Sequence, residues 1–183
     1  MRCQYLLEGK NVNLRVVEKE DLPQLVEWID DPAFYGKYEP LLQVTKLELE
    51  KEYDKLPSEE KWFIIEKKDG TKVGGMSHFL EGNLMEIGYD LISGERGKGY
   101  GTEAVKLLSD YLFLSKDIVR IQAQTDPRNV ASMRVLEKAG FTIEGILRKS
   151  LFVRGEWRDR ALYSILREEW KEPKILTKTA SQS

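Results

Sequence analysis

The sequence predicts an α+β domain built around one mixed β-sheet, and three observations support this fold class. The chain has 183 residues and is 41% hydrophobic, which suits one domain with a sizeable core but not two. Its first half contains segments that alternate apolar and polar residues, as strands do, with helical segments among them. A glycine cluster then separates a strand from a strong amphipathic helix and a further strand, an order that favours parallel pairing.

The first half is expected to form a meander of four strands that is interrupted early by two helices. Asp21 and Pro23 are suitable residues for the start of the first helix, whereas the second helix has only a thin apolar stripe. Asp69-Gly70 predicts a tight hairpin turn, and a further turn is expected over residues 81–83. The elements, in chain order, are expected at residues 11–17, 21–31, 45–56, 62–65, 72–80 and 84–92.

The second half is expected to contain two helices and three strands. Apolar residues recur at helical spacing from Ala104 to Leu112, directly after the glycine cluster. Residues 119–124 alternate as a strand, and Asn129 and Gly140 are good residues for the start and the end of the next helix. Two last strands, at residues 146–153 and 158–166, are expected to form a hairpin. We therefore divide the chain into an N-terminal extension (1–10), one domain (11–170) and a flexible tail (171–183).

Composition excludes several classes of function. Lys and Arg number 29 against 31 Asp and Glu, so the net charge of -2 gives no reason to expect nucleic-acid binding. The single cysteine, Cys3, cannot form an internal disulfide, is a poor candidate for a buried nucleophile, and fits a cytoplasmic protein. One Cys and one His make an ordinary zinc site implausible, so we expect no metal. No apolar run reaches signal-peptide or membrane-span length, so we expect neither export nor membrane insertion.

The glycine cluster is the strongest functional signal. Gly97, Gly99 and Gly101 lie between a strand and a helix start, where several backbone N–H groups can point at one anion. Arg96 and Lys98 favour phosphate binding over the simpler interpretation, a flexible turn. The chain lacks both the Gly-Lys-Ser/Thr of a P-loop and a GxGxxG after its first strand, so neither of those phosphate sites is expected.

The segment Arg96-Gly97-Lys98-Gly99-Tyr100-Gly101 resembles the Q/R-x-x-G-x-G/A signature of the GCN5-related N-acetyltransferases (GNAT). Further segments, together with Leu14-Arg15 and Asp21, resemble the branch that contains ribosomal-protein N-terminal acetyltransferases. The resemblance covers about residues 12–170, and its further segments are 129–141, 144–148 and 155–163.

This resemblance implies a GNAT-type fold, in which a mixed sheet with helices on both faces is splayed between its fourth (84–92) and fifth (119–124) strands. Acetyl-CoA, the acetyl donor, would lie in the opening. Gly88 is where a bulge would most easily free backbone groups for the pantetheine arm, although a glycine can also simply relieve crowding. The resemblance places the coenzyme contacts at Tyr89, Asp90, Leu91, Arg96, Gly97, Lys98, Gly99, Gly101, Thr102, Asn129 and Ser132.

The chemistry requires a proton acceptor for the amine and a proton source for the departing thiolate. Glu86 is the first candidate for the acceptor, although a strand carboxylate is often merely solvated, and Asp90 and Asp159 are weaker candidates. By resemblance, Ser132 can reach the sulfur, while Asn129 also caps its helix. The family often has a tyrosine four residues after this serine, but this chain has Leu136. Either Ser132 or water would then supply the proton, or the thiolate leaves unassisted.

The acceptor is expected to be a primary amine that attacks directly in a ternary complex. A protein N-terminus is the first candidate by resemblance, followed by polyamines and aminoglycosides. The acceptor pocket could be lined by His78 or by Trp28, Tyr35, Tyr38 and Trp62, although all of these residues can equally belong to the packed interior.

Two other classes of function stay open from the residues alone. One is a non-catalytic CoA-sensing or interaction module that has kept the cleft, and the other is a protein that uses the same glycines to bind ATP. The chain is expected to be a monomer or a homodimer.

Overall fold

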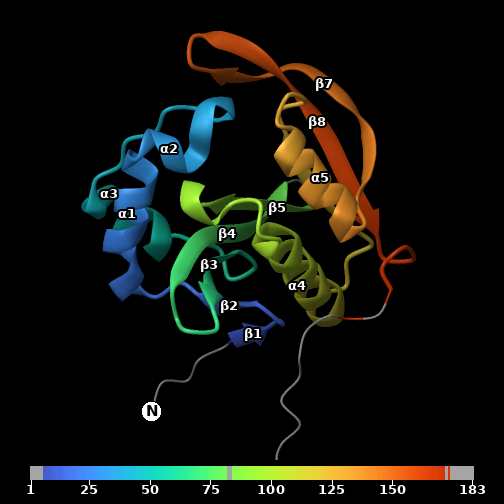
Figure 1. Ribbon diagram of the computed structural model, residues 1–183, viewed down its shortest axis with the longest axis horizontal. Helices are drawn as coiled ribbons and strands as arrows, with labels where there is room; N and C mark the ends of the chain where they lie inside the picture. Colours follow the sequence, from blue (N-terminus) through green and yellow to red (C-terminus); the bar gives the residue numbers. More distant parts are fainter. Residues whose placement is uncertain (1–5, 82–83, 172, 174–183) are drawn as a thin grey trace, which may run out of the picture.

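The computed structural model describes residues 6–81, 84–171 and 173, and it contains one eight-stranded sheet (Figure 1). The strand order is β1-β2-β3-β4-β5-β6-β8-β7, and within the described residues every pair of neighbouring strands is antiparallel except β5 with β6. The strands are β1 (Leu6–Glu8), β2 (Val12–Val16), β3 (Lys61–Lys67), β4 (Lys72–Glu81), β5 (Leu84–Leu91), β6 (Arg120–Thr125), β7 (Thr142–Val153) and β8 (Glu156–Leu166).

The predicted strands and the parallel pairing are confirmed, and the structure adds β1 within the segment that we treat as an extension. β7 also begins earlier than expected, at Thr142. Cys3, the Gly82-Asn83 part of the predicted turn, and residues 172 and 174–183 of the predicted tail lie outside the described residues.

The predicted helices are present, and a short one was missed. The helices are α1 (Leu22–Asp30), α2 (Pro32–Tyr35), α3 (Lys46–Asp54), α4 (Tyr100–Ser115) and α5 (Val130–Ala139), with three-residue 3-10 turns η1 (Lys19–Asp21), η2 (Gly36–Tyr38) and η3 (Ser93–Glu95). The missed helix, α2, starts where the Asp31 side chain accepts a hydrogen bond from the Ala33 amide, directly after α1 ends. One turn of helix is too short to show an apolar period, so the sequence pattern could not reveal it.

The sheet is covered on both faces, as predicted. Alternate residues of β3 show this best: Phe63 and Ile65 belong to the main core with α4, whereas Ile64 belongs to a second core with α1 and α3. Figure 1 shows α1, α2 and α3 grouped on one side of the sheet, while α4 and α5 lie together on the other side. A strand buried on both faces explains why residues 62–65 read as a continuous apolar run.

The sheet opens between β5 and β6. These two strands pair only at Met85 with Ile121 and at Glu86 with Gln122, although β5 continues to Leu91. The predicted splay is therefore confirmed. The predicted bulge at Gly88 is wrong, because the register of β4 with β5 is unbroken and places Gly88 opposite Ser77. A bulge is not needed here, since the departure of β6 already leaves one edge of β5 without a partner strand.

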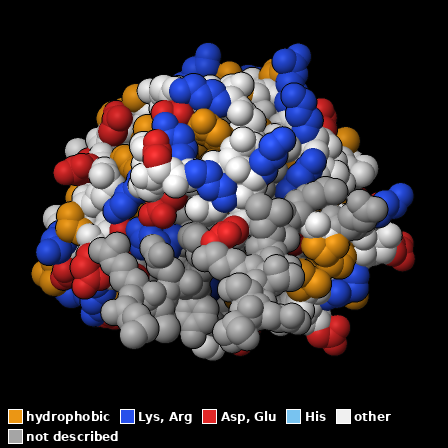
Figure 2. Space-filling view, turned by 60° about the horizontal axis from the view of Figure 1, so that its bottom comes forward, with side chains coloured by type: hydrophobic (Ala, Val, Ile, Leu, Met, Phe, Trp, Pro, Cys, Tyr) orange, Lys and Arg blue, Asp and Glu red, His pale blue; other side chains and the backbone are white. Residues whose placement is uncertain are grey.

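The surface agrees with the balanced composition. Lys and Arg side chains and Asp and Glu side chains both occur across the face shown in Figure 2. Within the described residues, none of the helices combines the length and the apolar character that crossing a bilayer demands.

A buried ion network joins the first half of the sheet. Arg15 of β2 donates to both carboxylate oxygens of Asp21, at 2.7 and 2.8 Å, and to Glu66 of β3 at 2.8 Å. Lys72 of β4 donates to Asp21 at 2.8 Å. Burial acts to raise the pKa of Asp21, but hydrogen bonds from Arg15 and Lys72 outweigh it and hold the pKa well below its usual range. Asp21 thus stabilises the fold as a carboxylate.

Replacing Asp21 with Asn should lower the free energy of unfolding by about 3 kcal/mol, because it leaves Arg15 buried without its full partner. Since the folded pKa of Asp21 is depressed, its contribution is present above the unfolded pKa of roughly 3.9 and is lost as the pH falls further. Denaturation in urea between pH 3 and 7 measures both effects. Asp54→Asn, in an exposed pair with Lys19, is the control and should change little; equal effects of the two variants would contradict the assignment.

Candidate functional site

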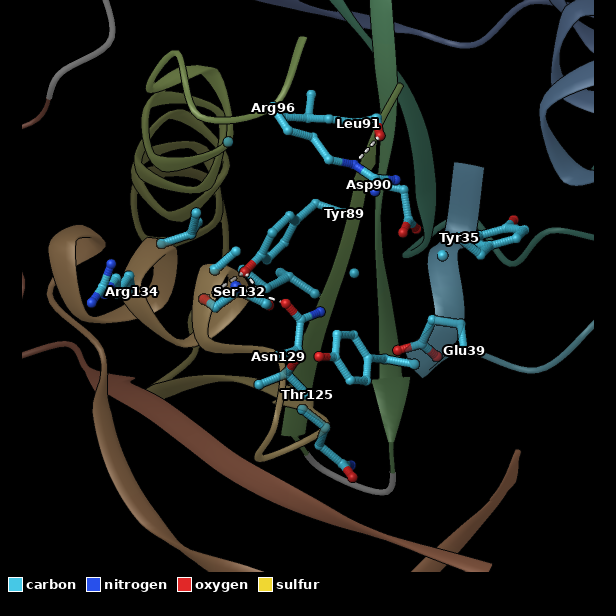
Figure 3. A pocket seen from close by; sticks show the side chains of 18 of the residues that line it. Tyr35, Glu39, Tyr89, Asp90, Leu91, Arg96, Thr125, Asn129, Ser132 and Arg134 are labelled. Atoms are coloured by element: carbon cyan, nitrogen blue, oxygen red, sulfur yellow. Dashed lines mark hydrogen bonds between the residues drawn. The ribbon is translucent and has the colours of Figure 1, made fainter. Parts of the chain in front are cut away.

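A cavity of about 970 Å³ lies where β5 and β6 part. Figure 3 shows side chains from β5, the start of α5 and the segment after α1 pointing toward this space. Of the predicted coenzyme contacts and first-choice catalytic residues, all line the cavity except Lys98, whose ammonium group forms a 2.9 Å ion pair with Glu95. The residues brought together are Glu86, Tyr89, Asp90, Leu91, Arg96, Gly97, Gly99, Gly101, Thr102, Asn129 and Ser132.

The glycine turn presents backbone to the cavity. Gly97 and Gly99 have φ angles of +76° and +87°, a backbone conformation that residues other than glycine rarely adopt. No atom lies within 4 Å of the position that a Cβ would take at either residue. Gly99 precedes α4 without any side-chain cap, so the first amides of this helix lack an internal partner. Gly101 is different, because a Cβ there would contact Leu91 and Val135 at 3.6 Å. Because these are ordinary van der Waals distances, the space at Gly101 would also admit a methyl side chain.

The Arg96 side chain has a structural partner that the sequence did not reveal. Its guanidinium donates to the carbonyl oxygen of Leu91 at 2.9 Å, to that of Ala33 at 3.1 Å and to that of Phe34. These bonds tie the end of β5 to α2. The contact of Arg96 with a phosphate stays a prediction.

The start of α5 brings a serine and a tyrosine together. Asn129 caps the helix by accepting from the Ser132 amide at 3.2 Å, as predicted. The Ser132 hydroxyl lies 2.8 Å from the Tyr89 hydroxyl, and burial raises the pKa of Tyr89. Leu136 has no acidic proton, and it is fully buried in the main core, so this position supplies no proton to the cavity.

The Tyr89 hydroxyl is a group that the sequence reasoning missed, because Tyr89 was considered only for a backbone contact. The available signal was its place on the strand beside the glycine turn. Only the fold, however, brings it to a serine 43 residues away.

Two of the carboxylates that line the cavity, Glu86 and Asp90, have contrasting surroundings. Glu86 is only 8% exposed and accepts hydrogen bonds from Gln122 at 2.7 Å and from Gln124 at 3.2 Å. Burial raises the pKa of Glu86, the two amides act in the opposite direction, and Glu81 raises it further. The solvated alternative for Glu86 is therefore wrong.

Asp90 is half-buried, and within the described residues no direct hydrogen bond or ion pair reaches its carboxylate. Burial raises the pKa of Asp90 well above its usual value, and Glu39 adds to this, whereas Arg96 and Arg160 act against it. Figure 3 shows the Asp90 carboxylate on the side of the cavity where Tyr35 lies. An acidic group without a partner at a cavity wall is a common mark of a functional site.

The segment after α1 is held over the cavity by arginines of the last hairpin. Arg160 of β8 donates to both carboxylate oxygens of Glu39, at 2.8 and 2.6 Å, and Arg154 donates to the carbonyl oxygen of Gly36 at 2.8 Å. The cavity wall thus joins parts of the chain more than 100 residues apart. No local sequence pattern indicated Glu39 or Arg160.

The remaining candidates separate into cavity and core. Tyr35 and Tyr38 line the cavity, whereas Trp28 and Trp62 line a second hollow beside it. His78 is 1% exposed between Phe63 and Tyr111, and burial lowers its pKa to about 4.

Asp159, a weaker candidate for the base, accepts a hydrogen bond from the Lys149 amide at 2.9 Å in the last hairpin and does not line the cavity. Among the described residues, no group of three or more His, Cys, Asp and Glu is placed to hold a metal ion.

Comparison with known proteins gives one consistent family. A model described as acetyltransferase (GNAT) domain matches residues 11–142. The chain is 33% identical over 175 residues to a probable N-acetyltransferase, YjcK, of Bacillus subtilis, covering 88% of this chain and 97% of that protein. It is 30% identical over 172 residues to a spermidine N(1)-acetyltransferase of Escherichia coli, covering 87% and 88%.

A second Escherichia coli protein, a [ribosomal protein uS5]-alanine N-acetyltransferase, is 29% identical over 110 residues, covering 59% of this chain and 57% of that protein. Among solved structures, an acetyltransferase of the GNAT family from Bacillus anthracis superposes with a TM-score of 0.76 at 27% identity, covering 89% of this chain and 99% of that one. The resemblance found in the sequence is therefore confirmed. The chain belongs to the GNAT family and is an acetyl-CoA-dependent N-acetyltransferase.

Proposed function

We propose that the cavity between β5 and β6 binds acetyl-CoA and that a primary amine attacks the thioester there directly. One observation carries the proposal: the unpaired edge of β5 and the uncapped start of α4 open into the same cavity. An extended, amide-containing chain can form hydrogen bonds with the free edge of β5, and an anion can bind the amides at the start of α4. The non-catalytic and ATP-binding alternatives gain no support, because the relatives are named as acetyltransferases.

We propose that these two features position the coenzyme. The amides from Gly97 to Thr102 would bind the pyrophosphate at the positive end of α4. The pantetheine arm would run along β5 at Tyr89, Asp90 and Leu91 and lead toward the start of α5. Asn129 uses its side-chain oxygen in the helix cap, so its amide nitrogen is available to the coenzyme.

The reaction needs one proton acceptor and one proton donor. Glu86 would take the proton of the amine, directly or through a water molecule, because its raised pKa suits a base that works near neutral pH. The amine nitrogen then bonds to the acetyl carbon, the carbon–sulfur bond breaks, and the thiolate of CoA leaves. We propose that the hydrogen-bonded pair of Ser132 and Tyr89 donates a proton to this thiolate. The pair would take the role of the tyrosine that many family members have where this chain has Leu136.

The acceptor is proposed to be an α-amino group at a protein N-terminus, in line with the similarity to the uS5-alanine acetyltransferase. A polyamine is the second candidate. It is favoured by the relative that acts on spermidine and by Glu81 and Glu86, whose carboxylates stand near each other at the cavity. The two carboxylates could form ion pairs with two ammonium groups of one polyamine molecule.

Gly99→Asp should weaken binding of CoA by about 100-fold, because a negative charge beside the pyrophosphate costs several kcal/mol. Calorimetric titration with CoA measures this loss. Gly70→Asp is a matched control, since Gly70 also has a positive φ, of +84°, and open space around it in the β3–β4 turn, which is not part of the cavity lining. Unchanged affinity in Gly99→Asp, or equal loss in both variants, would argue against the pyrophosphate site.

Glu86→Gln should reduce kcat by about 10²- to 10⁴-fold without a loss of CoA affinity. In the unmodified enzyme, the rate should increase as the pH rises through the raised pKa of Glu86, because only the deprotonated carboxylate can accept the proton. The variant should lose this increase. Rates of thiol release between pH 5 and 9 measure both. The exposed Glu52→Gln serves as control, and a retained pH profile in Glu86→Gln would exclude Glu86 as the base.

Tyr89→Phe and Ser132→Ala should each lower kcat by about 10- to 100-fold, because the thiolate then leaves without its proton donor. The double variant should be little worse than either single one, since the two hydroxyls act as a pair. Steady-state kinetics with CoA titration separate this effect from coenzyme binding. Tyr53→Phe, which removes a hydroxyl bonded to the Val17 carbonyl, is the control; normal turnover in Tyr89→Phe would refute the assignment.

A further inference from the structure

A second hollow, of about 270 Å³, lies between the sheet and the layer formed by α1, α2 and α3. Its walls are mostly apolar and include Trp28, Ile29, Phe34 and Trp62. The hollow and the main cavity have four lining residues in common: Tyr35, Gly88, Tyr89 and Asp90. A group bound at the shared wall could therefore extend into either space.

The floor of the hollow is formed by small residues on adjacent strands. Gly75 and Ser77 of β4 lie opposite Asp90 and Gly88 of β5. Neither Gly75 nor Gly88 has a positive φ, and a Cβ there would come no closer than 3.9 Å to the Phe63 carbonyl oxygen or 3.5 Å to the Ser77 hydroxyl.

The backbone thus does not require glycine at Gly75 or Gly88. The neighbouring Gly74 is a useful contrast, because a Cβ there would lie 2.1 Å from the Asp90 carbonyl oxygen. Gly74 is needed for close packing of the strands, whereas Gly75 and Gly88 leave a space that the protein itself does not fill.

The charge at the shared wall indicates which kind of group binds there. The Asp90 carboxylate has no direct hydrogen bond or ion pair among the described residues. The negative charge of Glu39 acts on it, but Glu39 is paired with Arg160, and the positive charges of Arg96 and Arg160 act in the opposite direction. An ammonium group fits this wall, because a half-buried carboxylate without a partner gains most from a cation. Asp90 is the only charged side chain among the described residues that line the hollow, so the part of the acceptor that lies beyond Asp90 should be uncharged.

Resting on the proposed function, we infer that the hollow is a specificity pocket for the acceptor: the enzyme prefers a primary amine that carries a compact apolar group, such as a phenyl ring or a branched aliphatic chain, close to its nitrogen. The reacting nitrogen lies at the shared wall beside Gly88, between Glu86 and Asp90 on the same strand. The apolar group enters the hollow toward Trp28 and Trp62. Such a group can belong to the first residue of a peptide or to a free amine, because the pocket contacts only this part of the molecule.

The test compares phenethylamine with ethylamine, and Phe-Ala-Ala peptide with Gly-Ala-Ala peptide, using spermidine as the polycationic substrate. In the unmodified enzyme, kcat/KM should be about 10- to 100-fold higher for the phenyl member of each pair, as expected for burial of a phenyl ring. The two pairs show whether peptides or free amines are the better source of this group. Equal kcat/KM within both pairs, or a preference for spermidine over phenethylamine, would overturn the inference.

Gly75→Leu fills the hollow from β4, on a residue that does not line the coenzyme cavity. The ratio of kcat/KM between the members of each pair should fall toward one, while the affinity for CoA stays the same. Ser77→Leu, on the same floor, replaces it if the circular dichroism spectrum shows that Gly75→Leu is not folded. A ratio that survives in a folded variant contradicts the pocket.

A binding measurement separates this inference from the proposed function. Calorimetry on the protein saturated with CoA should show that phenethylamine binds at least ~10-fold more tightly than ethylamine, and that Gly75→Leu removes the difference. If no amine is acetylated but this difference is seen, the assigned chemistry fails and the pocket stands. If amines are acetylated but the difference is absent, the pocket fails and the chemistry stands.

Discussion

The structure depends on the fact that β5 and β6 are bonded to each other at only two positions, Met85 with Ile121 and Glu86 with Gln122. Closer pairing would close the cavity, and no pairing would divide the sheet into two separate halves. Glu86 stands at this last point of contact and is bonded to Gln122 and Gln124 of the departing strand. The group assigned as base is thus held by the junction that creates the cavity.

Arginines perform most of the long-range positioning around the opening. Arg96 connects the glycine turn to α2, and Arg160 and Arg154 connect the last hairpin to the segment from Gly36 to Glu39. Each makes more than one hydrogen bond, mostly to backbone carbonyls or to a carboxylate, which suits the planar, many-donor guanidinium group. The wall of the main cavity is therefore fixed from both sides of the split.

Much of the fold and of the site could be predicted from the sequence because local signals agree with it. The alternation in β2, the Asn129 cap and the Gly97 and Gly99 turn each follow from a short-range rule that the structure obeys. The rest depends on tertiary contacts. Neither the Tyr89–Ser132 pair nor the hollow above Gly75 leaves a periodic trace, and the bulge was expected because the departure of β6 cannot be read from β5 alone.

The strand order has a consequence for the synthesis of the chain on the ribosome. β6 lies between β5 and β8, and β8 is the last strand among the described residues, so one edge of β6 stays unpaired until Leu166 has emerged. The meander of β1 to β5 can assemble earlier from neighbouring segments. Completion of the catalytic half therefore waits for the synthesis of β8, and a nascent chain that stops before β8 exposes a bare strand edge of the kind that molecular chaperones protect.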